Sequence, residues 1–225
     1  MSPDPKPAQL ADAAGDEQAR RSQGLVGLWW RRVPRVLWRP GDVLVALRET
    51  DDDDQAARQE PILAVVLLAG MAAILLQGGN TVDDPSIDLL VASVITYIAG
   101  ALYGAAGYFV LGLGVMLGVR GADGDTTFRS ARHLVAFSAV PVAASLLLLA
   151  PAVMVGYGSA YFRGQAPDSS RLVVVALGLP FAAWSAVLLV AGLRVTHRLP
   201  WRGVVVAVAL ASVFVAAFVT LPAVL

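Results

Sequence analysis

The side chains that most often perform catalysis or ligate metals are scarce in this sequence. It has two histidines, His133 and His197, and no cysteine. Neither histidine belongs to an H-E-x-x-H arrangement and no third ligand accompanies them, so we predict no metal site. The sequence also lacks a phosphate-binding glycine loop with lysine and a G-x-S-x-G nucleophile elbow. We therefore expect a protein that is not an enzyme, uses no cofactor and does not bind nucleic acid.

Charged residues are equally sparse, at 15% of the chain, and they avoid five apolar stretches. Those stretches are 61–82, 89–119, 134–162, 172–193 and 203–225, and none contains Asp, Glu, Lys, Arg or His. A charge at the centre of a bilayer costs at least about 2.5–3.5 kcal/mol and is retained mainly for transport, proton relay or sensing. The absence of such charges weighs against a proton-coupled transporter.

Hydroxyl groups within the stretches leave a second function open. A neutral-solute pathway could be lined by hydroxyls, although they more often donate to a backbone carbonyl or to a neighbouring helix. A subunit of a small-solute transporter or channel is therefore the alternative function. A membrane enzyme acting on lipid is a weaker alternative, because it would need converging His, Asp or Arg at one interface. The candidate hydroxyls are those of Ser93, Thr96, Ser138, Ser145 and Ser185.

The elements that hold these residues are predicted from length and hydropathy. The mean hydropathy is +0.66, and each stretch exceeds the roughly 20 residues that cross a bilayer. We predict an all-α fold, an integral membrane bundle of five transmembrane helices with an N-terminal interfacial helix. Residues 1–23 form a disordered cytoplasmic tail, residues 24–60 hold the amphipathic interfacial helix and an acidic linker, and residues 61–225 form the transmembrane domain.

The interfacial helix is predicted from arginine and tryptophan at helical spacing, which suits the headgroup region. Its arginines are Arg31, Arg32, Arg35 and Arg39. The run Asp51 to Asp54 that follows lacks the spaced ligands of a calcium loop, so we interpret it as a solvated linker.

Basic residues predict the topology. Residues 1–60, 120–133 and 194–202 carry 15 Lys and Arg in total, whereas the loops 83–88 and 163–171 together carry two. Cytoplasmic loops are enriched in Lys and Arg, so we expect a multi-pass protein of the plasma membrane with a cytoplasmic N-terminus and an external C-terminus. Abundant Ala, Val, Gly and Arg with one lysine indicates a bacterial gene.

One face of the second stretch repeats at steps of three and four, and its positions are all glycine except Leu111. Small side chains let helix backbones approach closely in a membrane. The face could form the seam of a homo-oligomer or pack within the bundle, where Ala207 and Ala211 of the last stretch could meet it. The predicted packing residues are Gly100, Gly104, Gly107, Gly114 and Gly118.

Polar residues at the predicted cytoplasmic ends of the helices form the candidate docking set. Together they would make a positive collar against the anionic inner leaflet. The collar either fixes topology only or docks anionic lipid headgroups or an acidic region of another membrane protein. The docking set consists of Arg129, Arg132, His133, Arg194, His197 and Arg198.

Three short segments resemble the Yip-domain family of Rab (Ypt)-interacting membrane proteins, in its bacterial branch. One holds Pro40, Val43 and Leu47, and the third holds Trp184, Gly192-Leu193-Arg194 and His197. The second runs from Gly118 to Gly121 and on through Phe128-Arg129, Ala136 and Pro141.

The resemblance covers residues 35–225 and implies a non-enzymatic, five-span membrane domain that organises or binds other membrane components. Eukaryotic members are tied to Rab GTPases and vesicle traffic. The Asp-Leu-Tyr-Gly-Pro type of signature found in that branch is absent here.

Overall fold

The computed structural model describes residues 35, 37–48, 59–78 and 86–224, and every regular element in this part of the chain is a helix. The prediction of an all-α membrane bundle is therefore confirmed for these residues. Most of the predicted interfacial helix, the acidic run and the tail lie outside them. The elements are α2 (Pro40–Arg48), α4 (Gln59–Leu76), α5 (Leu89–Gly121), α6 (Phe128–Ser138), α7 (Val140–Gly156), α8 (Ser159–Phe162), α9 (Asp168–Thr196) and α10 (Trp201–Val224).

Three helical segments are long and apolar enough to cross a membrane, namely Leu89–Gly121, Phe128–Gly156 and Asp168–Thr196. Two shorter apolar segments, Ile62–Leu76 and Trp201–Phe214, coincide with the first and last predicted spans. The chain is thus a multi-pass membrane protein, and the count of five spans stays a prediction.

The third predicted stretch, 134–162, differs from the helix that forms there. The helix begins earlier, at Phe128, because the Thr127 hydroxyl caps its first turn by accepting from the backbone N–H of Ser130 at 3.2 Å. It breaks at Ala139, since Pro141 has no N–H to donate four residues back. It ends at Gly156, because Gly158 adopts a φ of +56° and turns the chain into α8.

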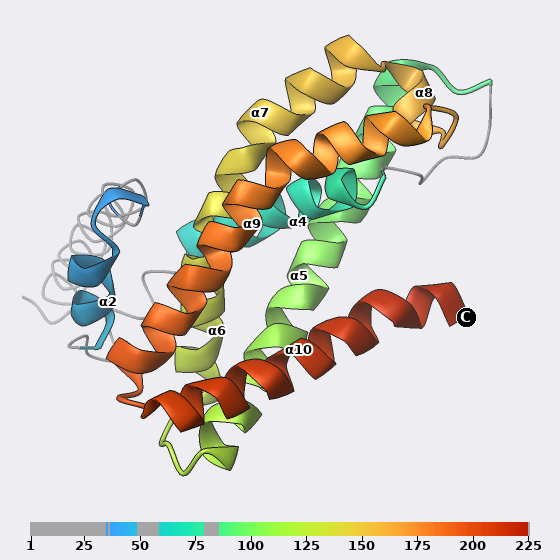
Figure 1. Ribbon diagram of the computed structural model, residues 1–225. Coiled ribbons are helices and arrows are strands. Elements are labelled where there is room, and N and C mark those ends of the chain that lie inside the picture. Colours follow the sequence, from blue (N-terminus) through green and yellow to red (C-terminus); the bar gives the residue numbers. More distant parts are fainter. Residues whose placement is uncertain (1–34, 36, 49–58, 79–85, 225) are drawn as a thin grey trace, which may run out of the picture.

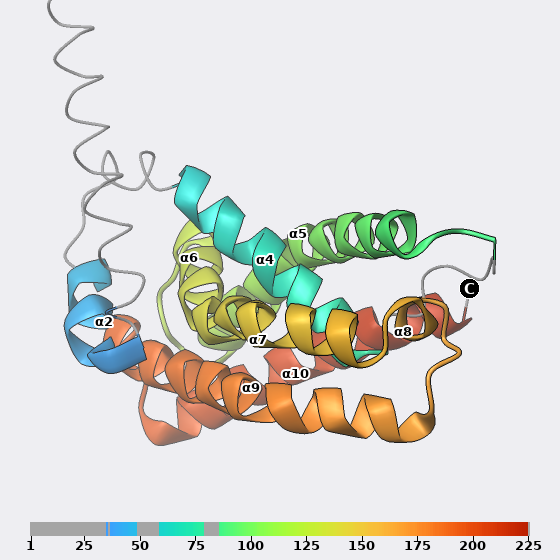
Figure 2. The ribbon, with the colours of Figure 1, turned by 90° about the horizontal axis from the view of Figure 1, so that it is seen from above.

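Helix α5 is the centre of the bundle, and α4 and α10 cross it (Figure 1). Helices α7 and α9 lie side by side, with α4 packed against α7 (Figure 2). At 33 residues, α5 is about 50 Å long, which exceeds the roughly 30 Å of hydrocarbon in a bilayer. The second predicted span must therefore tilt or project from the membrane.

Glycines allow α4 and α5 to cross with their backbones in contact, at a point we call the glycine crossing (Gly70, Gly100 and Gly104). A Cβ added to Gly104 would lie 2.5 Å from the carbonyl oxygen of Val66 and 2.7 Å from the Cα of Gly70. A Cβ added to Gly100 would lie 2.8 Å from the Cα of Met71. Real side chains essentially never approach backbone atoms so closely, so larger residues cannot be accommodated without moving a helix.

The lower half of α5 packs on α10 through the same kind of contact. A Cβ at Gly118 would lie 2.6 Å from the Cα of Ala207, and one at Gly114 would lie 3.2 Å from the side chain of Phe214. Gly107, between these two contact regions, is buried and borders a partly open cavity between the helices. Within this chain, the predicted glycine face therefore meets α4 at one end and α10 at the other.

Candidate functional site

One end of the bundle gathers α2, the end of α5, the start of α6, the end of α9 and the start of α10 (Figure 1). Leu44 of α2 belongs to the same buried cluster as Leu134 of α6 and Leu193 of α9. The loop after α5 touches the loop after α9, since a Cβ at Gly124 would lie 2.8 Å from Leu199. We call this region the basic end, and it brings both loops of the docking set together.

The two ends of the bundle differ in charge. The segments 120–133 and 194–202 of the basic end contain six arginines and two aspartates, an excess of four positive charges. The loops 83–88 and 163–171 contain two arginines and four aspartates, an excess of two negative charges. The described parts of these loops lie at the opposite end, beside α8 (Figure 1).

Arg132 is held among aromatic rings at the basic end. Its guanidinium carbon lies 4.6 Å from the ring centroid of Phe128, 5.0 Å from that of Phe109 and 5.3 Å from that of Tyr108. The side chain crosses α5 at Gly112, where a Cβ would collide with it. Ring faces attract a cation, so three rings fix this half-buried guanidinium, whose Nε is buried without a hydrogen-bond partner.

The other arginines of the docking set are exposed. Arg194 lies with its guanidinium carbon 4.2 Å from the ring centroid of Trp201, which is itself 59% exposed. Arg129 stands in the first turn of α6, and Arg198 adopts a φ of +51° in the loop after α9. An arginine paired with tryptophan is well suited to the membrane interface, because each side chain combines an apolar body with a polar end.

The two histidines are less accessible than a docking role requires. His133 is buried, at 7% exposed, so the structure corrects its placement on the surface. It is buried because α6 is covered on all sides from this point onward, where His133 and every residue up to Ser138 are buried.

His197 caps α9 and is mostly covered. Burial lowers the pKa of His197, and a hydrogen bond with the backbone of Asp125 opposes that shift. Its Nε2 is buried without a partner. Within the described residues no group of three His, Cys, Asp or Glu side chains comes together in a way that could hold a metal ion.

The hydroxyls considered for a solute pathway are mostly occupied by their own helices. Ser93, Thr96, Ser138 and Ser145 each donate to a carbonyl three or four residues earlier, at 2.7–2.9 Å. Ser185 differs, because its buried hydroxyl oxygen has no hydrogen-bond partner in the described structure. Four of the five candidates thus serve local helix structure.

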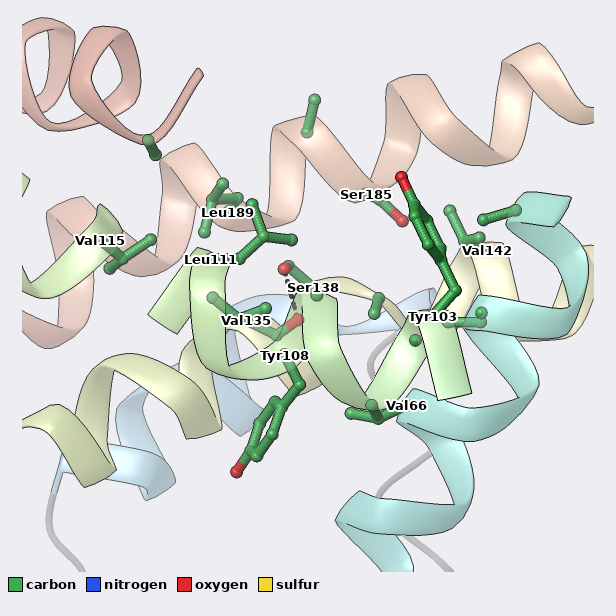
Figure 3. A pocket seen from close by; sticks show the side chains of 18 of the residues that line it. Val66, Tyr103, Tyr108, Leu111, Val115, Val135, Ser138, Val142, Ser185 and Leu189 are labelled. Atoms are coloured by element: carbon green, nitrogen blue, oxygen red, sulfur yellow. Dashed lines mark hydrogen bonds between the residues drawn. The ribbon is translucent and has the colours of Figure 1, made fainter. Parts of the chain in front are cut away.

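A cavity of about 410 Å³ lies between α4, α5, the α6–α7 junction, α9 and α10. Figure 3 shows Tyr103 and Leu111 of α5, Ser138 and Val142 of the α6–α7 junction, and Ser185 and Leu189 of α9 around it, with the ring of Tyr108 turned away from Ser138. Its volume is within the usual range for small-molecule sites. Aliphatic and small side chains form most of the lining, and no charged residue contributes to it.

A comparison with known families matches residues 35–223 to the Yip1 domain. The chain belongs to the Yip1 domain family. This confirms the resemblance to the family that was drawn from the three short segments, and the bacterial branch stays a prediction. None of the curated proteins and none of the solved structures compared with the chain matches it.

The structure shows where the family-like segments of this Yip1 domain lie. Pro40 begins α2, and Val43 packs in a buried cluster with Phe137 of α6 and Leu188 of α9. Gly118 lies against α10, and Pro141 lies in the first turn of α7, after the break in the third span. Gly192 is buried against Leu134. These positions join the helices around the basic end.

Sequence reasoning missed two features of this Yip1 domain. The first is the aromatic cage of Arg132, for which the signal was Tyr108-Phe109 one helical turn before Gly112 and Phe128 one turn before the arginine. The second is the cavity, for which tyrosines such as Tyr103 in an otherwise aliphatic span gave a weak signal. Both depend on contacts between helices that periodicity does not specify.

Proposed function

We propose that the chain is a non-enzymatic Yip1-domain protein of the bacterial plasma membrane. It binds anionic lipids at its basic end and thereby organises other components of the membrane. In this proposal the N-terminus and the basic end face the cytoplasm and the C-terminus is external. The single observation that supports it most is the excess of four positive charges in the two loops that the fold brings together.

The exposed arginines fit this role physically. Each Lys or Arg near an anionic leaflet contributes about 1 kcal/mol of attraction. Arg129, Arg194 and Arg198 are exposed at the basic end, so their guanidinium groups can reach phosphates. Guanidinium groups bind phosphate in a planar, bidentate manner that lysine does not reproduce. We therefore assign recognition of headgroups to these three residues and anchoring of the end to Arg132.

The alternative, a subunit of a small-solute transporter or channel, rests on the cavity. A transporter for polar solutes would present a continuous polar path at mid-membrane. Instead, the hydroxyl of Ser138 is bonded to its own helix, as is that of Ser212, and most of the lining is aliphatic. We therefore favour lipid binding over solute transport. The remaining surface leaves other membrane proteins or a second copy of the chain as further partners.

The test uses the full chain with Arg129 and Arg194 both changed to lysine. This variant keeps the positive charge and the topology signal but loses bidentate phosphate recognition. We expect normal insertion, and loss of most of the anionic lipid that native mass spectrometry detects on the wild-type protein released from mixed anionic and zwitterionic nanodiscs. A variant that inserts normally and retains anionic lipid at the wild-type level would show that the arginines only orient the protein.

A further inference from the structure

A groove runs along α9 beside the start of α10, from the basic end towards the middle of α9. Its polar mouth is formed by Arg194 and Trp201. Deeper in the groove, α9 contributes only Ala186, Val187, Val190 and Ala191, and Val195 lies beside the mouth. The groove thus combines one cation at the interface with an apolar floor below it.

The groove adjoins the central cavity at one residue. Ala186 lines both of them, and Leu189 of the same helix faces the cavity. The two helices are able to leave this opening because α10 packs mainly on α5 and makes little contact with α9. Figure 1 shows the far half of α10 turning away from the bundle.

We propose that this groove and cavity form a site for one anionic phospholipid, with its phosphate at Arg194 and one acyl chain running past Ala186 into the cavity. The inference rests on the proposed function, because it assigns a specific lipid position to the basic end. The occupant is identified by charge and by shape. Arg194 favours an anion at the mouth, whereas the uncharged and mostly aliphatic lining favours an apolar chain beneath it.

The distance from Arg194 to Ala186 along α9 agrees with the depth of one leaflet. Ala186 lies eight residues before Arg194, which is about 12 Å along the helix. One leaflet supplies about half of a hydrocarbon core of roughly 30 Å. A chain whose phosphate sits at Arg194 therefore reaches the opening at Ala186, and its remaining length enters the 410 Å³ cavity.

Trp201 supports the position of the headgroup. Its ring stacks on the guanidinium of Arg194, which holds the cation at the mouth of the groove. Tryptophan also favours the level of the headgroups in a bilayer. The pair therefore marks the height at which the phosphate would bind.

The test uses the full-length protein in phosphatidylcholine nanodiscs with a phosphatidylglycerol probe that carries a diazirine near the end of one acyl chain. After illumination, mass spectrometry locates the labelled residues. We expect labels on cavity residues such as Leu111, Leu189 and Val208. A phosphatidylcholine probe with the same chain should label them less.

Two variants test the polar mouth of the groove and the entry to the cavity separately. Arg194→Gln should reduce cavity labelling about fivefold, the equivalent of losing one cation near the surface. Ala186→Trp should abolish cavity labelling by blocking the opening. Its matched control is Ala183→Trp on the same helix, where the alanine is exposed and borders neither the groove nor the cavity.

Each outcome decides between the two proposals. Labels confined to the outer faces of the helices, with anionic lipid still retained through Arg129 and Arg194, would overturn the groove site and leave the proposed function standing. If the wild type and the double lysine variant each retained the anionic and the zwitterionic lipid equally, the proposed function would be overturned as well. Cavity labels that survive Ala186→Trp would overturn the groove site, because the proposed chain must pass Ala186 to enter the cavity.

Discussion

The glycine crossing and the basic end show two different ways to hold helices together. At the crossing, Gly70 and Gly104 place backbone against backbone, so the contact allows no added atom. At the basic end, long side chains such as Arg132 lie over aromatic rings, and Arg129 stays exposed. The crossing forms because its glycines have no side chains to separate the helices, whereas the basic end exposes arginine side chains such as that of Arg129. We interpret the crossing as structural and the basic end as the binding region.

The largest effect is expected at the crossing. Gly104→Leu places a bulky side chain where even a Cβ would lie 2.5 Å from a backbone oxygen. Overpacking a core costs about 1–3 kcal/mol and sometimes more, so we expect a marked loss of melting temperature in detergent. Gly156→Leu is the control, because a Cβ there has open space within 4 Å. If the two variants melt alike, the α4–α5 contact does not stabilise the bundle.

A smaller effect is expected from the caged arginine. Arg132→Gln removes the cation from three rings and should cost about 0.5–2 kcal/mol. Arg129→Gln removes the same charge from an exposed position and should change stability by less than about 0.5 kcal/mol. Both variants should bind less anionic lipid, because each loses one positive charge. Equal melting temperatures would mean that the rings add nothing to the stability of the end.

These contrasts also show what the sequence could and could not predict. The helices followed from long uncharged runs, and the small-residue face followed from spacing alone. The break at Ala139 was foreseeable at Pro141, but the turn at Gly158 required a backbone conformation that hydropathy does not report.

The candidate site was less predictable. The arginines were located from the loops between spans, yet the burial of His133 depends on how α6 rotates against its neighbours. The cavity arises where α9 and α10 diverge, and no local pattern specifies the angle between two helices. Features confined to one helix were thus predictable, and features shared between helices were not.

The smallest effect concerns pH at the basic end. The pKa of His197 is lowered in the folded protein by burial, so the unfolded chain takes up a proton at higher pH than the folded one. Stability should therefore fall as the pH drops through about 6.5, the ordinary value for histidine. His197→Gln should flatten this dependence between pH 7.5 and 5.5, measured as melting temperature in nanodiscs. An unchanged slope would assign the pH dependence to other groups.

The central claim is that the basic end lies against the cytoplasmic leaflet, and its orientation can be measured directly. The chain has no cysteine, so Gly121→Cys at the basic end and Gln165→Cys at the opposite end each introduce a single exposed thiol. A membrane-impermeant maleimide added to intact cells should label Gln165→Cys at once and Gly121→Cys only after the membrane is permeabilised. Labelling of Gly121→Cys in intact cells would place the basic end outside and contradict the proposed function.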